Sequence, residues 1–234
     1  MTPAWLSDSI RSVDPKWAER ALEHQAQLTK PPGSLGRLEE VAVRLSALQG
    51  RDRPAADRVH VTVFAADHGV ALEGVSAFPQ EVTSQMLDNF VRGGAAISVM
   101  SRSIGASLEI VDVGTAAGGT DRPGVRNHRV GKGTANIRTQ DAMSEAQLER
   151  ALQAGREAAE RASQAGCDLF IGGDMGIANT TSATALACAL LSADPKTLAG
   201  PGTGLNPAGV MHKATVIKDA LERFMGAGGR PLEV

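Results

Sequence analysis

The sequence predicts an α/β protein in which helices flank a parallel sheet. Short apolar runs at 59–66, 108–113 and 168–171 alternate with helix-like segments. Such alternation is typical of parallel strands joined by right-handed crossovers. In addition, many of the 26 glycines follow these runs. Small-molecule sites of parallel sheets form at the carboxyl ends of the strands, so we expect a ligand site there.

The first 50 or so residues predict a pair of helices. Asp14 and Pro15 fit the N-cap and first position of a helix that runs to about Leu28, and the prolines at 31–32 end it. Ser34 can cap a second helix, in which apolar residues recur at helical spacing: Leu35, Leu38, Val41, Ala42, Leu45 and Leu48. We expect a small helical subdomain over residues 1–55 and an α/β domain over residues 56–234.

In the α/β domain, helices are expected over 80–92, 95–104, 144–164 and 180–191, and from Asn206-Pro207 onward. Ser144 and Gln147 predict a capping box, and Gly166 a helix end. Helix 180–191 is rich in alanine and leucine and is expected to be buried. The last helix has an apolar stripe at Val210, Ala214, Ile217, Leu221 and Phe224. Residues 115–139 read as irregular, and the final segment, 230–234, looks like the approach to another strand.

Composition excludes several classes of function. The formal net charge is −2, which implies neither a polyanion partner nor a membrane surface. Aromatic residues make up 3% and tyrosine is absent, which argues against stacking platforms for nucleic acid. No apolar run is long enough for a transmembrane helix. Cys167 and Cys188 match no metal or redox spacing, so we expect buried free thiols and a cytoplasmic location.

Two glycine-rich segments are candidate phosphate sites. Residues 172–181 follow a strand expected to be buried and open a helix, whose free N–H groups attract an anion. Asp174 within this segment suits a sugar hydroxyl or a nitrogen heterocycle. The segment lacks the P-loop and dinucleotide patterns, which favours a monophosphate. Residues 200–207 form a second such turn, and Lys213 follows about two turns into the next helix. The alternatives are ordinary strand–turn–helix packing for the first segment and a surface loop with a solvated lysine for the second.

Asp67 and His68 also follow a strand. One interpretation is a divalent-metal ligand pair, as in some hydrolases. The other histidines show no matching spacing, so we expect no metal. A structural or substrate-lining role for this pair is the prediction, with Gly69 allowing a turn.

Nine segments together resemble the nicotinate-nucleotide–dimethylbenzimidazole phosphoribosyltransferases of cobalamin lower-ligand synthesis. They are residues 29–39 (TKPPGSLGRLE), 66–69, 74–75, 79–83, 92–96, 111–114, 133–137, 172–181 and 200–213. The resemblance implies Rossmann-like domains in a homodimer, each with a small helical domain built from both chain ends. It implies a glycosyltransferase that moves the phosphoribosyl group of nicotinate mononucleotide to 5,6-dimethylbenzimidazole. The products are nicotinate and α-ribazole 5′-phosphate, formed with inversion at the anomeric carbon and with no cofactor.

The resemblance also implies roles for individual residues. The phosphoribosyl group would be held by Gly176, Thr180, Gly202, Gly204 and Lys213, and the base by Phe78, Met86 and Met175. The family usually has Glu where this chain has Asp174. Its proton acceptor, a Glu in a Leu-Gly-Glu-Gly-Ser-Gly motif, has no match here, so we expect a C-terminally truncated form with Asp174 as a stand-in catalytic residue. Two alternatives remain: a non-catalytic fragment that binds the mononucleotide or the base, and a metal-dependent hydrolase.

Overall fold

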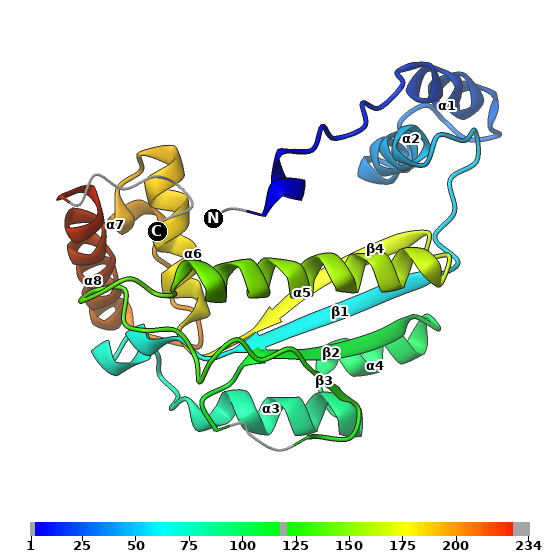
Figure 1. Cartoon of the computed structure of the whole chain (residues 1–234). Helices are drawn as coiled ribbons and strands as arrows, with labels where there is room; N and C mark the ends of the chain where they lie inside the picture. Colours follow the sequence, from blue (N-terminus) through cyan, green and yellow to red (C-terminus); the bar gives the residue numbers. More distant parts are fainter. Residues whose placement is uncertain (1–2, 118–120, 227–234) are drawn as a thin grey trace.

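The computed structural model describes residues 3–117 and 121–226. Its centre is a four-stranded parallel sheet in the order β3-β2-β1-β4 (Figure 1). The strands are β1 (Val59–Ala66), β2 (Ser107–Gly114), β3 (Val125–Asn127) and β4 (Leu169–Met175). The predicted α/β class is therefore confirmed. Strand β3 was not expected, because it is short and lies inside the segment that reads as irregular.

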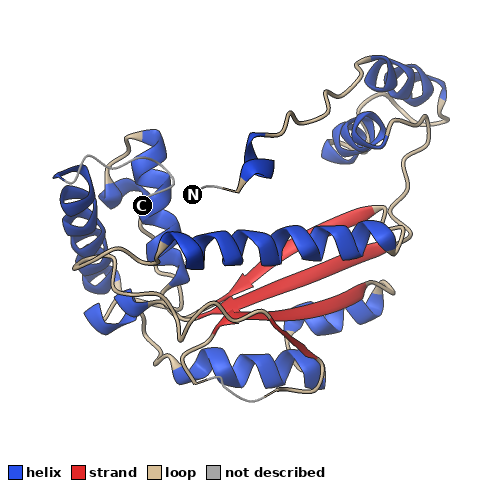
Figure 2. Cartoon of the chain, in the orientation of Figure 1, coloured by secondary structure: helices blue, strands red, loops and turns tan. Residues whose placement is uncertain are grey.

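Helices cover both faces of the sheet (Figure 2). Helices α3 (Glu81–Arg92) and α4 (Ala96–Ser103) lie on one face, and α5 (Glu145–Gln164) lies on the other. Beyond the carboxyl ends of the strands lie α6 (Asn179–Leu191), α7 (Pro195–Leu198) and α8 (Pro207–Gly226). There are also two 3-10 turns: η1 (Ala4–Ser7) precedes the first α-helix, and η2 (Gly69–Glu73) lies between β1 and α3. None of the described helices is both long and apolar enough to cross a membrane.

Two apolar cores hold the α/β part together. The first joins β1 and β2 to α3 through residues such as Val61, Ile110 and Leu87. The second joins η2 to α6 and α8, with Val70, Cys188 and Ile217 among its members. Because the second core binds α6 and α8 to each other, it fixes the two loops that precede these helices.

Local capping signals are largely confirmed. The Ser144 side chain accepts from the Gln147 N–H, and the Gln147 side chain accepts from the Ser144 N–H, which completes the capping box. The Asn206 side chain accepts from the Gly209 N–H at 2.9 Å, as expected for the start of α8. The prediction for Ser34 is wrong. Gly36 is the N-cap of α2 (Arg37–Gln49), because the preceding chain folds into turns through positive-φ glycines at 33 and 36.

Helix α1 (Lys16–Gln27) packs against α2, and the pair lies near the amino ends of the strands (Figure 1). The Gln49 side chain donates to the Asp168 carbonyl at 3.0 Å, and Arg51 pairs with the Asp168 carboxylate at 3.2 Å. The apolar face expected on α2 is only partly covered, since Leu45 is half-buried but Leu48 is 71% exposed, and Ser46 is the residue of α2 that is buried. The physical reason is that α2 has α1 as its main helical neighbour, so that only one side of α2 is covered.

Three burial predictions need correction. Strand β4 is not buried: among the described residues it pairs with β1 alone, so Phe170 and Ile171 remain 40% and 37% exposed. It also continues to Met175, so Gly172, Gly173 and Asp174 belong to the strand and not to the loop. Helix α6 buries one side only, and Leu190 lies on its exposed side. Both cysteines are free thiols, but only Cys188 is buried, and Cys167 is half-buried.

Candidate active site

The candidate site lies at the carboxyl ends of β1 and β4. The chain passes from β1 to β2 on one side and later returns to place β4 on the other side of β1. Ligands of open parallel sheets bind at such a switch in strand order. Three loops approach this point: the loop after β1, the turn between β4 and α6, and the loop before α8.

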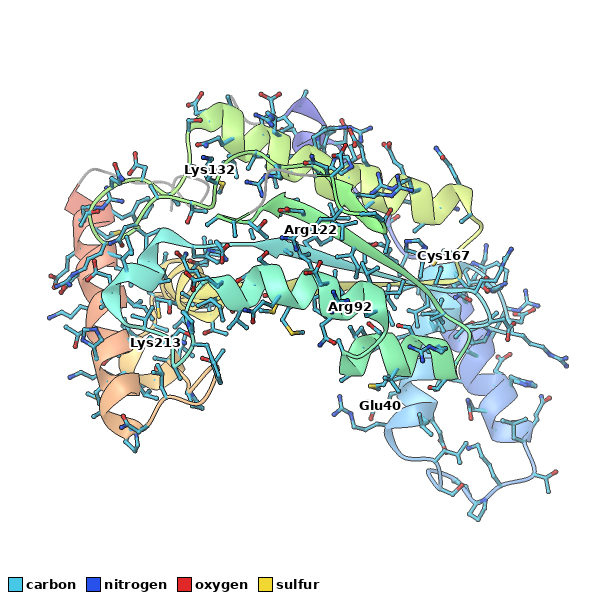
Figure 3. The ribbon with its side chains drawn as sticks, turned by 90° about the horizontal axis from the view of Figure 1, so that it is seen from below. Glu40, Arg92, Arg122, Lys132, Cys167 and Lys213 are labelled. Atoms are coloured by element: carbon cyan, nitrogen blue, oxygen red, sulfur yellow. The ribbon has the colours of Figure 1, made fainter. Side chains whose placement is uncertain are left out.

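Lys213 is the most unusual side chain here. It is 1% exposed on α8, and its ammonium Nζ donates to the Thr180 hydroxyl at 2.6 Å and to the Gly200 carbonyl at 3.3 Å. No carboxylate in the described part of the chain forms an ion pair with it, and burial lowers the pKa of its ammonium. Figure 3 places Lys213 at the α8 end of the molecule, at the opposite end from Cys167. A buried, unpaired ammonium favours an anion beside it.

Only some of the five residues predicted to bind the phosphoribosyl group lie close together. A Cβ at Gly202 would lie 3.0 Å from the Thr180 Oγ1 and 3.4 Å from the Lys213 Nζ, so Thr180, Gly202 and Lys213 meet. Gly204 lies two residues on, but its N–H donates to the Pro201 carbonyl at 3.0 Å. That N–H is therefore used to close the turn and is not free for an anion. We call Thr180, Gly202 and Lys213 the cradle.

Gly176 has a packing role in the turn between β4 and α6. A Cβ there would lie 2.2 Å from the Ala66 carbonyl oxygen and 3.2 Å from the His68 ring. Only glycine lets the turn approach the end of β1 this closely. The next residue but one, Ala178, is buried with φ of 71°, a left-handed conformation that costs free energy in a non-glycine residue. This turn directs α6 toward Lys213.

Asp174 is exposed on β4 and accepts a hydrogen bond from the Asn179 side chain. The Asn179 side-chain carbonyl oxygen in turn accepts from the Thr180 N–H at 2.7 Å. The carboxylate is thus linked through Asn179 to the residue that holds Lys213. Its exposure leaves room for a ligand group beside it.

The three predicted base-binding residues do not form one cluster. Met86 of α3 and Met175 of β4 are half-buried and pack against the same apolar core. Phe78 is outside that core and is 52% exposed on the loop before α3. An apolar slot would need this loop to lie over the two thioethers.

Asp67 and His68 support the strand ends. The buried Asp67 carboxylate accepts from the Ala116 N–H at 2.7 Å, and its other oxygen has no partner among the described residues. The His68 ring lies 3.2 Å from the Ser182 hydroxyl. Burial lowers the pKa of His68, which the nearby carboxylates Asp67 and Asp174 only partly offset. Within the described ranges, no group of three or more His, Cys, Asp or Glu residues could hold a metal.

Two side chains at this site did not stand out in the sequence. Ser182 holds the His68 ring, and Thr203 reaches across to the loop that carries Phe78. Hydroxyl residues are common near helix starts and turns, so only their partners distinguish them.

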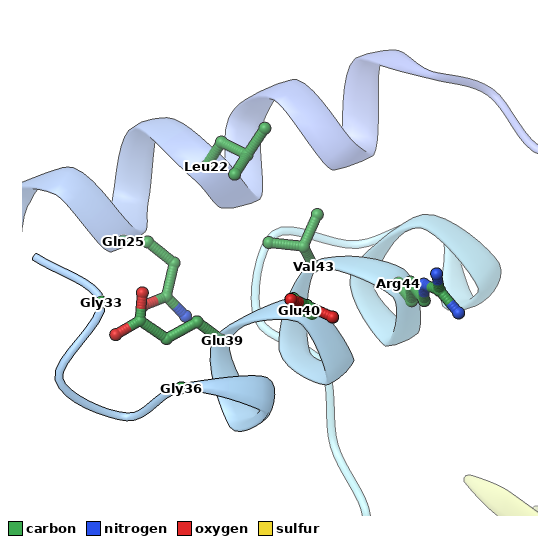
Figure 4. Close-up of a pocket in the computed structure, with 8 residues that line it drawn as sticks. All are labelled: Leu22, Gln25, Gly33, Gly36, Glu39, Glu40, Val43 and Arg44. Carbon is green, nitrogen blue, oxygen red and sulfur yellow. The ribbon is translucent and has the colours of Figure 1, made fainter.

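A separate cavity of about 500 Å³ lies between α1 and α2, with Leu22 and Val43 on its walls (Figure 4). The segment 29–39 borders it. The Glu39 carboxylate accepts from Lys30 at 2.7 Å and from the Leu35 N–H at 3.1 Å, and the Lys30 hydrogen bond holds the pKa of Glu39 below its usual value. These contacts stabilise the connection between the helices.

Known proteins match the chain over most of its length. A family model described as phosphoribosyltransferase matches residues 10–234. The nicotinate-nucleotide–dimethylbenzimidazole phosphoribosyltransferase of Pseudomonas aeruginosa (strain LESB58) is 59% identical over 221 residues, which are 94% of this chain and 63% of that protein. The protein of the same name from Pseudomonas fluorescens (strain SBW25) is 55% identical over 233 residues, 100% of this chain and 66% of that protein.

A crystal structure of the protein of this name from Thermus thermophilus superposes with a TM-score of 0.85 at 48% identity. The superposition covers 94% of this chain and 65% of that chain. The chain thus spans 63% and 66% of the lengths of these two Pseudomonas relatives. On the family match and these identities, the chain belongs to the nicotinate-nucleotide–dimethylbenzimidazole phosphoribosyltransferase family.

Proposed function

We propose that the chain binds nicotinate mononucleotide and transfers its phosphoribosyl group to 5,6-dimethylbenzimidazole. A ring nitrogen of the benzimidazole attacks the anomeric carbon, and the bond to the pyridinium nitrogen breaks. The pyridine ring takes the bonding electrons and leaves as nicotinate, while the benzimidazole loses its N–H proton. The products are nicotinate and α-ribazole 5′-phosphate, with inversion at the anomeric carbon.

The buried Lys213 is the observation that carries this proposal. Its ammonium has two neutral oxygen partners, Thr180 Oγ1 and the Gly200 carbonyl, and no negative charge nearby to balance it among the described residues. A phosphate monoester in the cradle would supply that charge and accept hydrogen bonds from the same ammonium. Phosphoryl oxygens gain more from such a donor when it is shielded from water.

We propose roles for the other predicted residues on the basis of their positions. Met86 and Met175 offer polarizable thioethers to a flat apolar ring, and Phe78 would close over it from the loop. Asp174, exposed at the end of β4, would contact the ribose hydroxyls or accept the proton of the benzimidazole. Gly176 and Gly204 would act through the shape of their turns.

A fragment that only binds the mononucleotide or the base is the second candidate, and the same assay separates the two. The hydrolase alternative has little support, because Asp67 and His68 have protein hydrogen-bond partners and no third ligand in the described part of the chain.

The test uses purified chain with nicotinate mononucleotide and 5,6-dimethylbenzimidazole. Chromatography with mass detection would follow nicotinate and α-ribazole 5′-phosphate, and calorimetry would measure mononucleotide binding. We expect Lys213→Met to weaken mononucleotide binding by about tenfold to a hundredfold, as expected for loss of a charge-assisted hydrogen bond. Lys218→Met is the matched control, because Lys218 is exposed on the same helix and pairs with Glu222.

Formation of both products by the chain supports the transferase. Binding that depends on Lys213 without turnover supports the binding fragment. Equal mononucleotide affinity in Lys213→Met and Lys218→Met would refute the role of the cradle.

We further propose a homodimer that acts in the cytoplasm, with residues 1–55 as a helical subdomain and 56–234 as the α/β domain. The basis is membership of the family and the separate position of α1 and α2 near the amino ends of the strands. Light scattering of the purified chain would report its mass, and a monomer at micromolar concentration would contradict the dimer.

A further inference from the structure

Thr203 lies between the cradle and the loop that carries Phe78. Its hydroxyl is 3.0 Å from the Ser76 hydroxyl and accepts from the Ala77 N–H at 3.3 Å. The Ser76 hydroxyl in turn accepts from the Phe78 N–H at 3.3 Å. One side chain of the loop before α8 therefore contacts Ser76 and Ala77 directly and is linked to Phe78 through the Ser76 hydroxyl.

Gly202, which directly precedes Thr203, belongs to the cradle. Gly202 lies against the Thr180 hydroxyl and the Lys213 ammonium, at the distances that define the cradle. Consecutive residues thus contact two different candidate sites. An anion that fixed Gly202 would act on Thr203 through a single peptide bond.

The turn that carries both residues is closed. The N–H groups of Gly204 and Leu205 both donate to the Pro201 carbonyl, at 3.0 and 2.9 Å. Gly202 and Gly204 have φ values of +54° and +110°, which are conformations that favour glycine. Because these hydrogen bonds close the turn around Gly202 and Thr203, we expect a shift of Gly202 to carry the Thr203 hydroxyl with it.

We propose that Thr203 is a positioning residue that couples the two substrate sites. An anion in the cradle fixes Gly202, Thr203 then holds residues 76–78, and Phe78 is placed for the aromatic base. This inference rests on the proposed function. Because coupling between two binding sites is reciprocal, a bound base should raise the affinity for the anion by the same factor.

The experiment measures binding to the full chain without turnover. Ribose 5-phosphate replaces the mononucleotide, since it brings the phosphate and the sugar but no leaving group. The dissociation constant of 5,6-dimethylbenzimidazole is measured by calorimetry with and without saturating ribose 5-phosphate. We expect ribose 5-phosphate to tighten base binding by about threefold to tenfold, as two exposed hydrogen bonds allow.

Thr203→Val keeps the shape of the side chain and removes the hydroxyl. We expect it to bring the coupling factor close to one and to leave the affinity for ribose 5-phosphate alone within about twofold. Thr203→Ser should retain the coupling. Thr215→Val is the matched control, because the hydrogen bond of the Thr215 hydroxyl that the described residues show stays within its own helix, to the Met211 carbonyl at 3.1 Å. Unchanged thermal unfolding of each variant shows that the fold is intact.

The outcomes separate the two proposals. Binding of both ligands without coupling in the unaltered chain, or full coupling in Thr203→Val, would overturn the role of Thr203 and leave the proposed function standing. Failure of the unaltered chain to bind either ligand would overturn the proposed function and this inference together.

Discussion

Replacing Gly176 by alanine tests whether the ends of β1 and β4 are in direct contact. The added Cβ would lie 2.2 Å from the Ala66 carbonyl oxygen and 3.2 Å from the His68 ring. The first contact is with backbone of the central strand, which cannot turn aside as a flexible side chain can. The strand or the turn must shift by about 1 Å, and we expect a loss of about 2–4 kcal/mol in the free energy of unfolding.

Two glycines serve as controls. A Cβ at Gly173, which lies within β4 three residues before Gly176, would have Val63 as its nearest neighbour at 3.5 Å, which is ordinary contact. A Cβ at Gly155 within α5 would meet nothing within 4 Å. We expect Gly173→Ala to be nearly neutral and Gly155→Ala to stabilise by about 0.5–1 kcal/mol, because alanine favours a helix over glycine.

Urea denaturation followed by circular dichroism measures all three variants. For a chain of this size each kcal/mol corresponds to about 2–4 °C in the unfolding midpoint, so thermal scans give a second reading. If the free energies of unfolding of Gly176→Ala and Gly173→Ala differ by less than about 1 kcal/mol, then the turn accommodates a Cβ at residue 176 and the close contact with Ala66 is refuted.

Three further predictions concern pH and backbone strain. Hydrogen bonds from Arg58 lower the pKa of Asp168 to about 2, against 3.8 for the free group. The ionised Asp168 carboxylate therefore stabilises the folded state fully above pH about 4, and this contribution is lost as pH falls through about 2. Acid titration of unfolding should therefore show a loss in that window which Asp168→Asn does not show, and an equal slope in both would contradict the assignment. Burial lowers the pKa of the Lys213 ammonium, so the affinity for ribose 5-phosphate should fall as pH rises through that lowered pKa. Calorimetry at several pH values would measure this fall, which should be absent in Lys213→Met. Ala178 has φ of 71°, so Ala178→Gly should change the free energy of unfolding by less than about 1 kcal/mol, because relief of backbone strain offsets the lost methyl group. Ala178→Val should lower that free energy by about 2 kcal/mol or more, as measured by urea denaturation. A valine variant as stable as the unaltered chain would refute the strain at this residue.

Some of the site could be predicted from residue types alone. Glycines after a strand and a lysine two turns into a helix indicated an anion, and the structure brings Thr180, Gly202 and Lys213 together. The use of the Gly204 N–H inside its own turn could not be predicted, because several turn conformations fit the same glycine-rich sequence. Phe78 and the two methionines were grouped by resemblance, and only Met86 and Met175 share a core.

The sequence by itself determined the features that depend on neighbours along the chain. The Ser144–Gln147 capping box, the Asn206 cap, the glycine helix ends and the period of each helix are set by residues within a turn or two of one another. The succession of the longer strands and helices along the chain follows from the same local signals, whereas the short β3 and α7 were not predicted. Family membership also rests on sequence, because the matching segments run the length of the chain.

Only the tertiary structure decided how distant segments meet. Strand order makes β4 an edge strand of the described sheet, so an apolar run that reads as buried is partly exposed. Packing of α6 on α8 brings the Lys213 ammonium to a hydroxyl 33 positions earlier, and Thr203 meets Ser76 across 127 positions. Such contacts depend on the arrangement of whole elements around a shared core, and no short stretch of sequence carries that information.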